Sequence, residues 1–274
     1  MKLFKLGLKY MFKNFGYMSL LWLLPTVFIG LFCGPYKIIE FVNLYPTTNI
    51  SNFGDIFAIL MPIDWLKVLL GILAIVLVAI FLSMVIGEME SHMRSGKFSF
   101  KNMFTFVNND ILVVLINIVL LAVIYTVLTF LFGCIAFLFH LIFSGLAFVP
   151  TTLNSIITIV LSCGFVALYV FVTLVFLINI PNMLTNGYSL KEGISSTMQL
   201  IGKSGFKLWL SFLLPYVVII PFVSLLCKTN FVWIANIICT YLQYMLYSSI
   251  TMTSFFELSN TPRYDNRKYY NYNK

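Results

Sequence analysis

The chain has 274 residues, of which 61% are hydrophobic, 17% aromatic and only 9% charged, and its mean hydropathy is +0.98. Roughly a quarter of the residues in soluble domains are charged, so this composition excludes a water-soluble globular protein. The formal net charge of +8 therefore matters for where the charges lie relative to a membrane, rather than for nucleic-acid binding. The five cysteines lie in or beside apolar runs with no CxxC spacing, which favours free thiols over a disulfide or zinc framework.

The N-terminal segment is typical of a basic amphipathic helix. Its lysines are spaced three, four and four residues apart and so share one stripe: Lys2, Lys5, Lys9 and Lys13. Phe4, Leu8 and Met11 form an apolar face opposite the lysines, and we expect this face to rest in the membrane interface. The stripe either binds anionic lipid or acts only as a basic flank that sets the topology.

Six apolar segments are long enough to cross a membrane as helices. We expect these spans at residues 15–33, 65–87, 111–132, 153–180, 208–227 and 231–256. Pro215 and Pro221 fall inside the fifth segment and are expected to kink it.

The connections between these segments differ in length and charge. Residues 34–64 are expected to form a loop with some local structure, and residues 87–110 form a charged connector. Residues 133–152 are apolar and either lie on or dip into the outer leaflet, or continue a long tilted third helix. Residues 257–274 are expected to form a cytoplasmic tail.

The basic residues are divided unequally between the two ends of the predicted helices. With six crossings both termini lie on one side, together with all but three of the 17 Lys and Arg residues. The three exceptions are Lys37, Lys67 and Lys228. The positive-inside rule therefore places both termini in the cytoplasm.

A basic segment precedes each pair of apolar segments, and two of these basic segments share a short pattern of Gly, Ser, an apolar residue and Lys. The pattern occurs at Gly96, Ser99, Phe100 and Lys101, and again at Gly187, Ser189, Leu190 and Lys191. The sequence thus predicts one all-α membrane domain over residues 1–274, with six transmembrane helices in three hairpins, each led by a basic amphipathic segment.

This arrangement resembles the six-helix membrane domain of some bacterial glycerophosphodiester phosphodiesterases and of related uncharacterised membrane proteins of Gram-positive bacteria. The resemblance implies a multi-pass protein of the bacterial cytoplasmic membrane. It implies no activity, because catalysis in those phosphodiesterases belongs to a separate soluble barrel domain.

The sequence contains few groups suited to catalysis. Glu88 and His92 are four residues apart and would share a helical face, but no third metal ligand accompanies them, which favours an ordinary charged helix end. His140 is expected to be neutral and hydrogen-bonded. No Asp, Glu, Lys or Arg lies in the interior of a predicted span, since Lys67 stands at the very start of the second one, and this argues against a proton-coupled carrier. We therefore expect no enzymatic activity, metal or cofactor.

Uncharged polar residues recur at helical spacing in the fourth and sixth segments. Such stripes serve either helix packing, which we favour, or a hydrated path through the membrane. The candidate path residues are Ser155, Thr158, Ser162, Asn236, Thr240, Gln243 and Tyr247.

We therefore expect a non-catalytic membrane protein that binds lipid or partner proteins at its cytoplasmic face, and no nucleic acid. The residues expected at the membrane surface are Lys2, Lys5, Lys9, Lys13, Arg94, Lys97 and Lys101. The alternative is the membrane subunit of an ABC-type transporter for a peptide or amphiphile, with an ATPase as partner. Gly202, Leu214 and Pro215 match part of the ATPase-docking loop of importer permeases, but the acidic part of that loop is absent.

Overall fold

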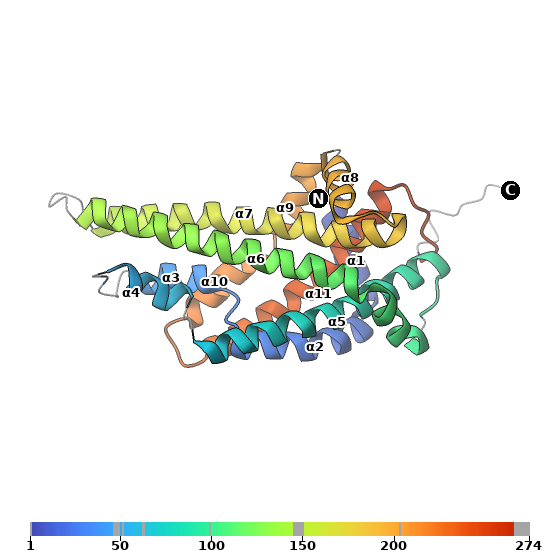
Figure 1. The fold of residues 1–274 in the computed structure, drawn as a ribbon, viewed down its shortest axis with the longest axis horizontal. Coiled ribbons are helices and arrows are strands. Elements are labelled where there is room, and N and C mark those ends of the chain that lie inside the picture. The colour runs from blue at the N-terminus through green and yellow to red at the C-terminus, as the bar shows by residue number, and fades with distance from the viewer. Residues whose placement is uncertain are drawn as a thin grey trace.

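The protein is an elongated bundle of helices in which the longest helices run along the long axis (Figure 1). The computed structural model describes residues 2–45, 50, 52–61, 64–98, 100–144, 151–202 and 204–265, and every element within these ranges is helical. The helices are α1 (Lys2–Lys13), α2 (Phe15–Phe32), α3 (Lys37–Leu44), α4 (Phe53–Leu60), α5 (Trp65–Ser95), the 3-10 turn η2 (Phe100–Asn102), α6 (Met103–Ser144), α7 (Thr151–Asn186), α8 (Leu190–Gly202), α9 (Gly205–Leu213), α10 (Tyr216–Leu226) and α11 (Val232–Leu258).

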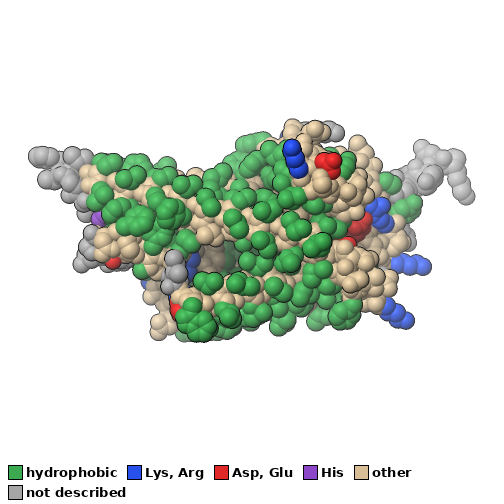
Figure 2. All heavy atoms as spheres, viewed as in Figure 1, with side chains coloured by type: hydrophobic (Ala, Val, Ile, Leu, Met, Phe, Trp, Pro, Cys, Tyr) green, Lys and Arg blue, Asp and Glu red, His purple; other side chains and the backbone are tan. Residues whose placement is uncertain are grey.

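Five helical segments of the described chain are long and apolar enough to cross a membrane. Hydrophobic side chains cover most of the flank seen in Figure 2, and Lys and Arg side chains gather mainly at the end near the C-terminus. Such a surface is consistent with an integral membrane protein. The five segments are Phe15–Leu44, Phe53–Ser95, Phe100–Ile142, Ser155–Asn186 and Gly205–Leu226.

The central helix of the bundle, α11, is not among these five. It contains the sixth predicted span but carries Ser, Thr, Tyr and Gln side chains that lower its hydropathy. It contacts α1, α2, α5, α7, α9 and α10, and every residue from Met245 to Phe256 is buried. A helix covered by other helices needs little lipid-facing apolar surface, which explains its polar composition.

Two glycines allow α1 and α2 to approach α11 closely. A Cβ atom added at Gly30 would lie 2.7 Å from the Cα atom of Ile237. A Cβ atom added at Gly7 would lie 3.0 Å from the Cα atom of Ile250. Because backbone atoms cannot move aside as a flexible side chain can, the spacing between these helices requires glycine at both positions.

The third predicted span is part of a much longer helix. α6 continues without interruption from Met103 to Ser144, roughly 60 Å at 1.5 Å per residue. Residues 133–144 therefore continue the third helix, as in the second of the two arrangements expected from the sequence. Residues 145–150 lie outside the described residues. The charged connector expected at 87–110 is also shorter than predicted, because α5 extends past the apolar run to Ser95.

The region expected to be a loop, residues 34–64, contains two helices that pack on the bundle. α3 contacts α7 and α10, and α4 contacts α6. Phe41 of α3 is fully buried and meets the ring of Phe132 in an edge-to-face contact at 5.6 Å. These aromatic contacts give the far half of α6 an apolar cluster of its own.

The fifth predicted span consists of two helices rather than one kinked helix. α9 ends at Leu213, α10 begins at Tyr216, and Pro215 lies in the turn between them. Proline removes a backbone donor and clashes with the preceding turn, so it separates the two helices here. Pro221, in contrast, is accommodated inside α10.

The two repeated glycines of the sequence end long helices in the same way. Gly96 has a φ of 73° and Gly187 a φ of 66°, both in the left-handed region. Their N–H groups donate to the carbonyls of His92 and Met183, each at 2.8 Å. Glycine is favoured at such helix ends because it has no Cβ atom. Ser99 of the same pattern lies outside the described residues.

The close packing on α11 can be tested with two alanine substitutions in α2. Gly30→Ala places a methyl group against the Ile237 backbone, and we expect it to destabilise the protein by about 1–3 kcal/mol. Gly16→Ala is the matched control, since nothing lies within 4 Å of a Cβ atom at Gly16. The measurement is the thermal midpoint of the purified protein in mild detergent. Equal midpoints for the two variants would contradict the proposed role of Gly30.

Candidate functional site

The basic stripe of α1 lies on the outside of the bundle. All four lysines are exposed: Lys2, Lys5, Lys9 and Lys13. On the opposite face Leu3 and Met11 are buried, and Phe4 and Leu8 pack against the main apolar core. The expectation that this apolar face rests in the membrane interface is therefore wrong, because α1 packs on α11 instead.

The other predicted surface cations lie near the end of α5. Arg94, Lys97 and Lys101 are all exposed, and Arg94 Nε lies 2.8 Å from Glu90 Oε1. The Arg94 guanidinium also lies 5.8 Å from the centre of the Phe256 ring in α11. The C-terminal segment joins this end to α1, because Tyr264 N–H donates to the carbonyl of Met93 and Lys13 Nζ donates to the carbonyl of Asp265.

His92 belongs to a buried aromatic cluster rather than to a metal site. Its Nδ1 atom lies 2.9 Å from the Tyr10 hydroxyl, which in turn lies 3.2 Å from the Tyr17 hydroxyl. The Phe98 ring stacks on the His92 ring, with 4.0 Å between the ring centres. Burial raises the pKa of Tyr10 well above its ordinary value, so this hydroxyl keeps its proton. Within the described ranges no three His, Cys, Asp or Glu side chains are arranged to hold a metal ion.

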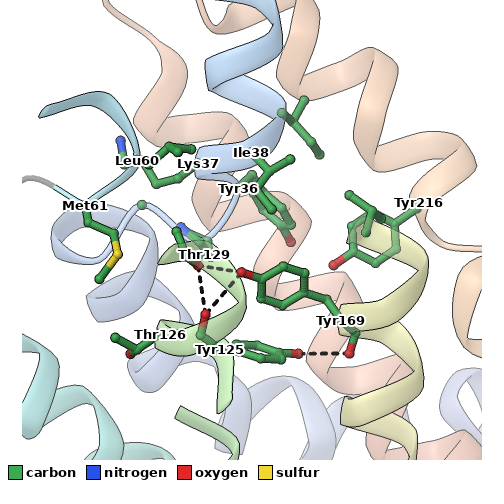
Figure 3. Close-up of a pocket in the computed structure, with 14 residues that line it drawn as sticks. Tyr36, Lys37, Ile38, Leu60, Met61, Tyr125, Thr126, Thr129, Tyr169 and Tyr216 are labelled. Carbon is green, nitrogen blue, oxygen red and sulfur yellow. Dashed lines mark hydrogen bonds between the residues drawn. The ribbon is translucent and has the colours of Figure 1, made fainter. Parts of the chain in front are cut away.

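Three cavities meet beside Tyr216, the first residue of α10. The first, about 280 Å³, is bordered by the α2–α3 connection, the end of α4, α6 and α7 (Figure 3). The second, about 140 Å³, lies in the bundle interior between α2, α5, α6, α7 and α11. The third, about 240 Å³, lies between α3, α7 and α10. Tyr216 lines all three cavities.

The tyrosines that line the first and second cavities are hydrogen-bonded to neighbouring helices. Tyr36 donates to Gln243 Oε1 at 2.7 Å, and Gln243 Nε2 donates to the Tyr216 hydroxyl at 3.4 Å. Tyr125 of α6 and Tyr169 of α7 each donate to the backbone carbonyl of the other, at 3.4 and 3.1 Å (Figure 3). These directional bonds fix the helices around the cavities.

The candidate path residues do not line a single path. Thr240, Gln243 and Tyr247 of α11 face the second cavity. Ser162 of α7 faces the third, and its hydroxyl donates to the carbonyl of Thr158 in the same helix at 2.7 Å.

The two ends of the candidate path lie apart from these cavities. Asn236 donates to Glu40 Oε1 at 3.2 Å, and Ser155 is half-buried near the start of α7. The predicted residues of α7 and α11 thus lie in different surroundings and do not form one path.

Sequence reasoning named Tyr247 as a candidate path residue but did not identify Tyr36, Tyr125, Tyr216 and Tyr244, nor the buried Glu40. Tyr36, Tyr125, Tyr169, Tyr216 and Tyr244 come from five different helices or connections, so no spacing in the sequence relates them. Glu40 stood in the expected loop, yet it is 7% exposed and pairs with Lys37 at 2.6 Å. No protein family, curated protein or solved structure matches this chain. Its function must therefore be inferred from its own geometry.

The link between Tyr36 and Gln243 predicts how two substitutions combine. Gln243→Leu removes the acceptor of the buried Tyr36 hydroxyl, and we expect a loss of about 1–3 kcal/mol of stability. Adding Tyr36→Phe removes the unpaired hydroxyl and should restore part of that loss. Thermal midpoints of the two single variants and the double variant measure the coupling. Strictly additive losses would show that the bond does not link the two helices.

Proposed function

We propose that this protein is a non-catalytic multi-pass membrane protein that binds lipid or a partner protein at its cytoplasmic face. The observation that supports this function is the exposed lysine stripe on a helix whose other face is fixed to α11. Because α1 is fixed in this way, Lys5 and Lys9 stay on its exposed face, whereas Lys2 pairs with Glu257 of α11 and Lys13 donates to the Asp265 carbonyl. Each lysine next to an anionic leaflet contributes about 1 kcal/mol of attraction.

In this proposal α11 is a sixth crossing, and the helices form three hairpins. The proposed pairs are α2 with α5, α6 with α7, and α9–α10 with α11, and the helices of each pair are in contact. Both termini would then lie in the cytoplasm of a bacterial cell, on the side that holds most of the Lys and Arg residues.

Neutralising lysines at the two ends of the protein tests the lipid-binding face. Lys5→Gln/Lys9→Gln should reduce the number of phosphatidylglycerol molecules that stay bound when the protein is released from mixed phosphatidylglycerol and phosphatidylcholine membranes. The matched control, Lys67→Gln/Lys228→Gln, removes the same charge from exposed lysines assigned to the other side. Native mass spectrometry counts the bound lipids. An equal reduction in both variants would contradict a specific role for α1.

A transporter subunit is the second candidate, favoured by polar side chains that face a cavity inside the bundle. Thr240, Gln243 and Tyr247 line this second cavity. The expected docking element for an ATPase is α8, which Asn182 of α7 holds through a 3.0 Å bond to Thr197. Ser189 donates two hydrogen bonds to Glu192 at the start of α8, which lowers the pKa of this exposed carboxyl.

Crosslinking in cells followed by purification distinguishes the two candidates. A transporter subunit should co-purify with a stoichiometric ATPase, and Lys191→Glu on the exposed side of α8 should weaken that association. Recovery of lipid alone, or only of further copies of this chain, would favour the first candidate.

A further inference from the structure

The cavities around Tyr216 form two chemically different compartments. The first and second carry tyrosine and threonine hydroxyls and the Gln243 amide. The third is bordered mainly by aliphatic side chains such as Ile39, Val166 and Ile220, together with a few polar ones, Asn43, Ser162 and Ser224. Because Tyr216 borders both compartments, a molecule placed beside it would meet hydrogen-bonding groups at one end and apolar side chains at the other.

Two tyrosine hydroxyls in the polar compartment retain hydrogen-bonding capacity, in addition to the Thr240 hydroxyl, which has no partner among the described residues. Tyr244 lines the second cavity, and its hydroxyl makes no hydrogen bond within the described part of the chain, although its backbone carbonyl accepts one from Ser248. The Tyr216 hydroxyl accepts a hydrogen bond from Gln243 Nε2 but has no acceptor for its own O–H among the described residues. Buried hydroxyls normally have partners, so both donors suit a ligand that supplies acceptor oxygens.

The charge of the compartments favours an uncharged ligand. Lys37 is the one charged residue among the described residues that line the three cavities. Its ammonium lies 2.6 Å from Glu40 Oε2, so its charge is already neutralised by an ion pair. A second ion placed here would lack a counterion, and its desolvation would oppose binding.

The first cavity is open on the apolar flank of the protein. Figure 2 shows a hollow between α6 and the first turns of α5, with a Lys or Arg side chain inside it and hydrophobic side chains on the surrounding flank. The α2–α3 connection, which lines the first cavity, passes through this region (Figure 1). An amphiphile could therefore enter sideways from the hydrocarbon region without crossing the charged end of the protein.

We propose that this site binds one uncharged single-chain amphiphile of the monoacylglycerol class. Its hydroxyl or ester oxygens accept hydrogen bonds from Tyr216 and Tyr244, and its alkyl chain occupies the third cavity. The site lies apart from the lysine stripe of α1 and needs no cation, so it goes beyond the proposed function. No covalent step takes part in the binding.

Binding of radiolabelled monooleoylglycerol to the immobilised full-length protein tests the site. The wild-type protein should bind one molecule saturably. Val166→Trp inserts a ring between the first and third cavities and should weaken binding at least tenfold. Leu225→Trp is the matched control, because Leu225 is 76% exposed on α10 and should leave binding unchanged. Absence of saturable wild-type binding, or equal binding by the two tryptophan variants, would overturn the proposal.

Two further measurements test the head group and remain decisive if Val166→Trp does not fold. Tyr216→Phe/Tyr244→Phe removes only hydroxyl groups and should weaken binding about 25-fold, at roughly fivefold for each hydrogen bond lost. An anionic competitor with the same chain, oleoyl-lysophosphatidylglycerol, should compete at least tenfold less well than unlabelled monooleoylglycerol. Unchanged binding by the double variant, or equal competition by the anionic lipid, would reject the assigned head-group chemistry.

The lysine variant separates this site from the proposed lipid-binding face. Lys5→Gln/Lys9→Gln should bind monooleoylglycerol as the wild-type protein does, because α1 lines none of the three cavities. A parallel loss of both lipids in this variant would show that the cavity site does not exist independently of α1.

Discussion

Close contact between α11 and the two N-terminal helices is the constraint on which the remaining packing depends. Gly30 brings α2 against the Ile237 backbone, and at this spacing Trp22 Nε1 reaches the Ser248 hydroxyl at 3.2 Å. Many polar side chains along α11 are then satisfied internally, as when the Thr253 hydroxyl donates to the Ser249 carbonyl at 2.7 Å, whereas the buried hydroxyls of Thr240, Thr251 and Ser254 have no partner among the described residues. A polar helix can occupy the centre of an apolar bundle only when its polar groups find such partners.

Hydrogen bonds between distant parts of the chain give this bundle its specificity. At one end Tyr10 joins His92 of α5, and in the interior Gln243 joins Tyr36 and Tyr216. Apolar packing between helices tolerates small rotations, whereas a buried hydroxyl or amide without a partner is costly. The cavities beside Tyr216 therefore persist between helices whose orientation is fixed by polar contacts rather than by complete filling of the core.

The helical class and the charged end could be predicted from the sequence because apolar run length and lysine spacing are local properties. The end of α6 could not be placed, since the sequence stays almost wholly apolar through residues 111–150 and hydropathy does not show whether the helix ends near Gly133 or near Gly145. The amphipathic pattern of α1 is the same whether its apolar face meets lipid or α11. The tyrosine cavities depend on helices that are distant in the chain, so only the tertiary structure brings Tyr36, Tyr125 and Tyr216 together.

The contact between Gly7 and Ile250 joins the first helix of the chain to the last one. A ribosome makes α1 long before α11, and domains assemble in the order in which their parts emerge. Throughout that interval Leu3 and Met11 have no helix to cover them, so the membrane surface is the place where a nascent α1 can bury them. Because α1 packs on α11, its final position can be reached only after α11 has been made, which makes that position a late step in the assembly of the bundle.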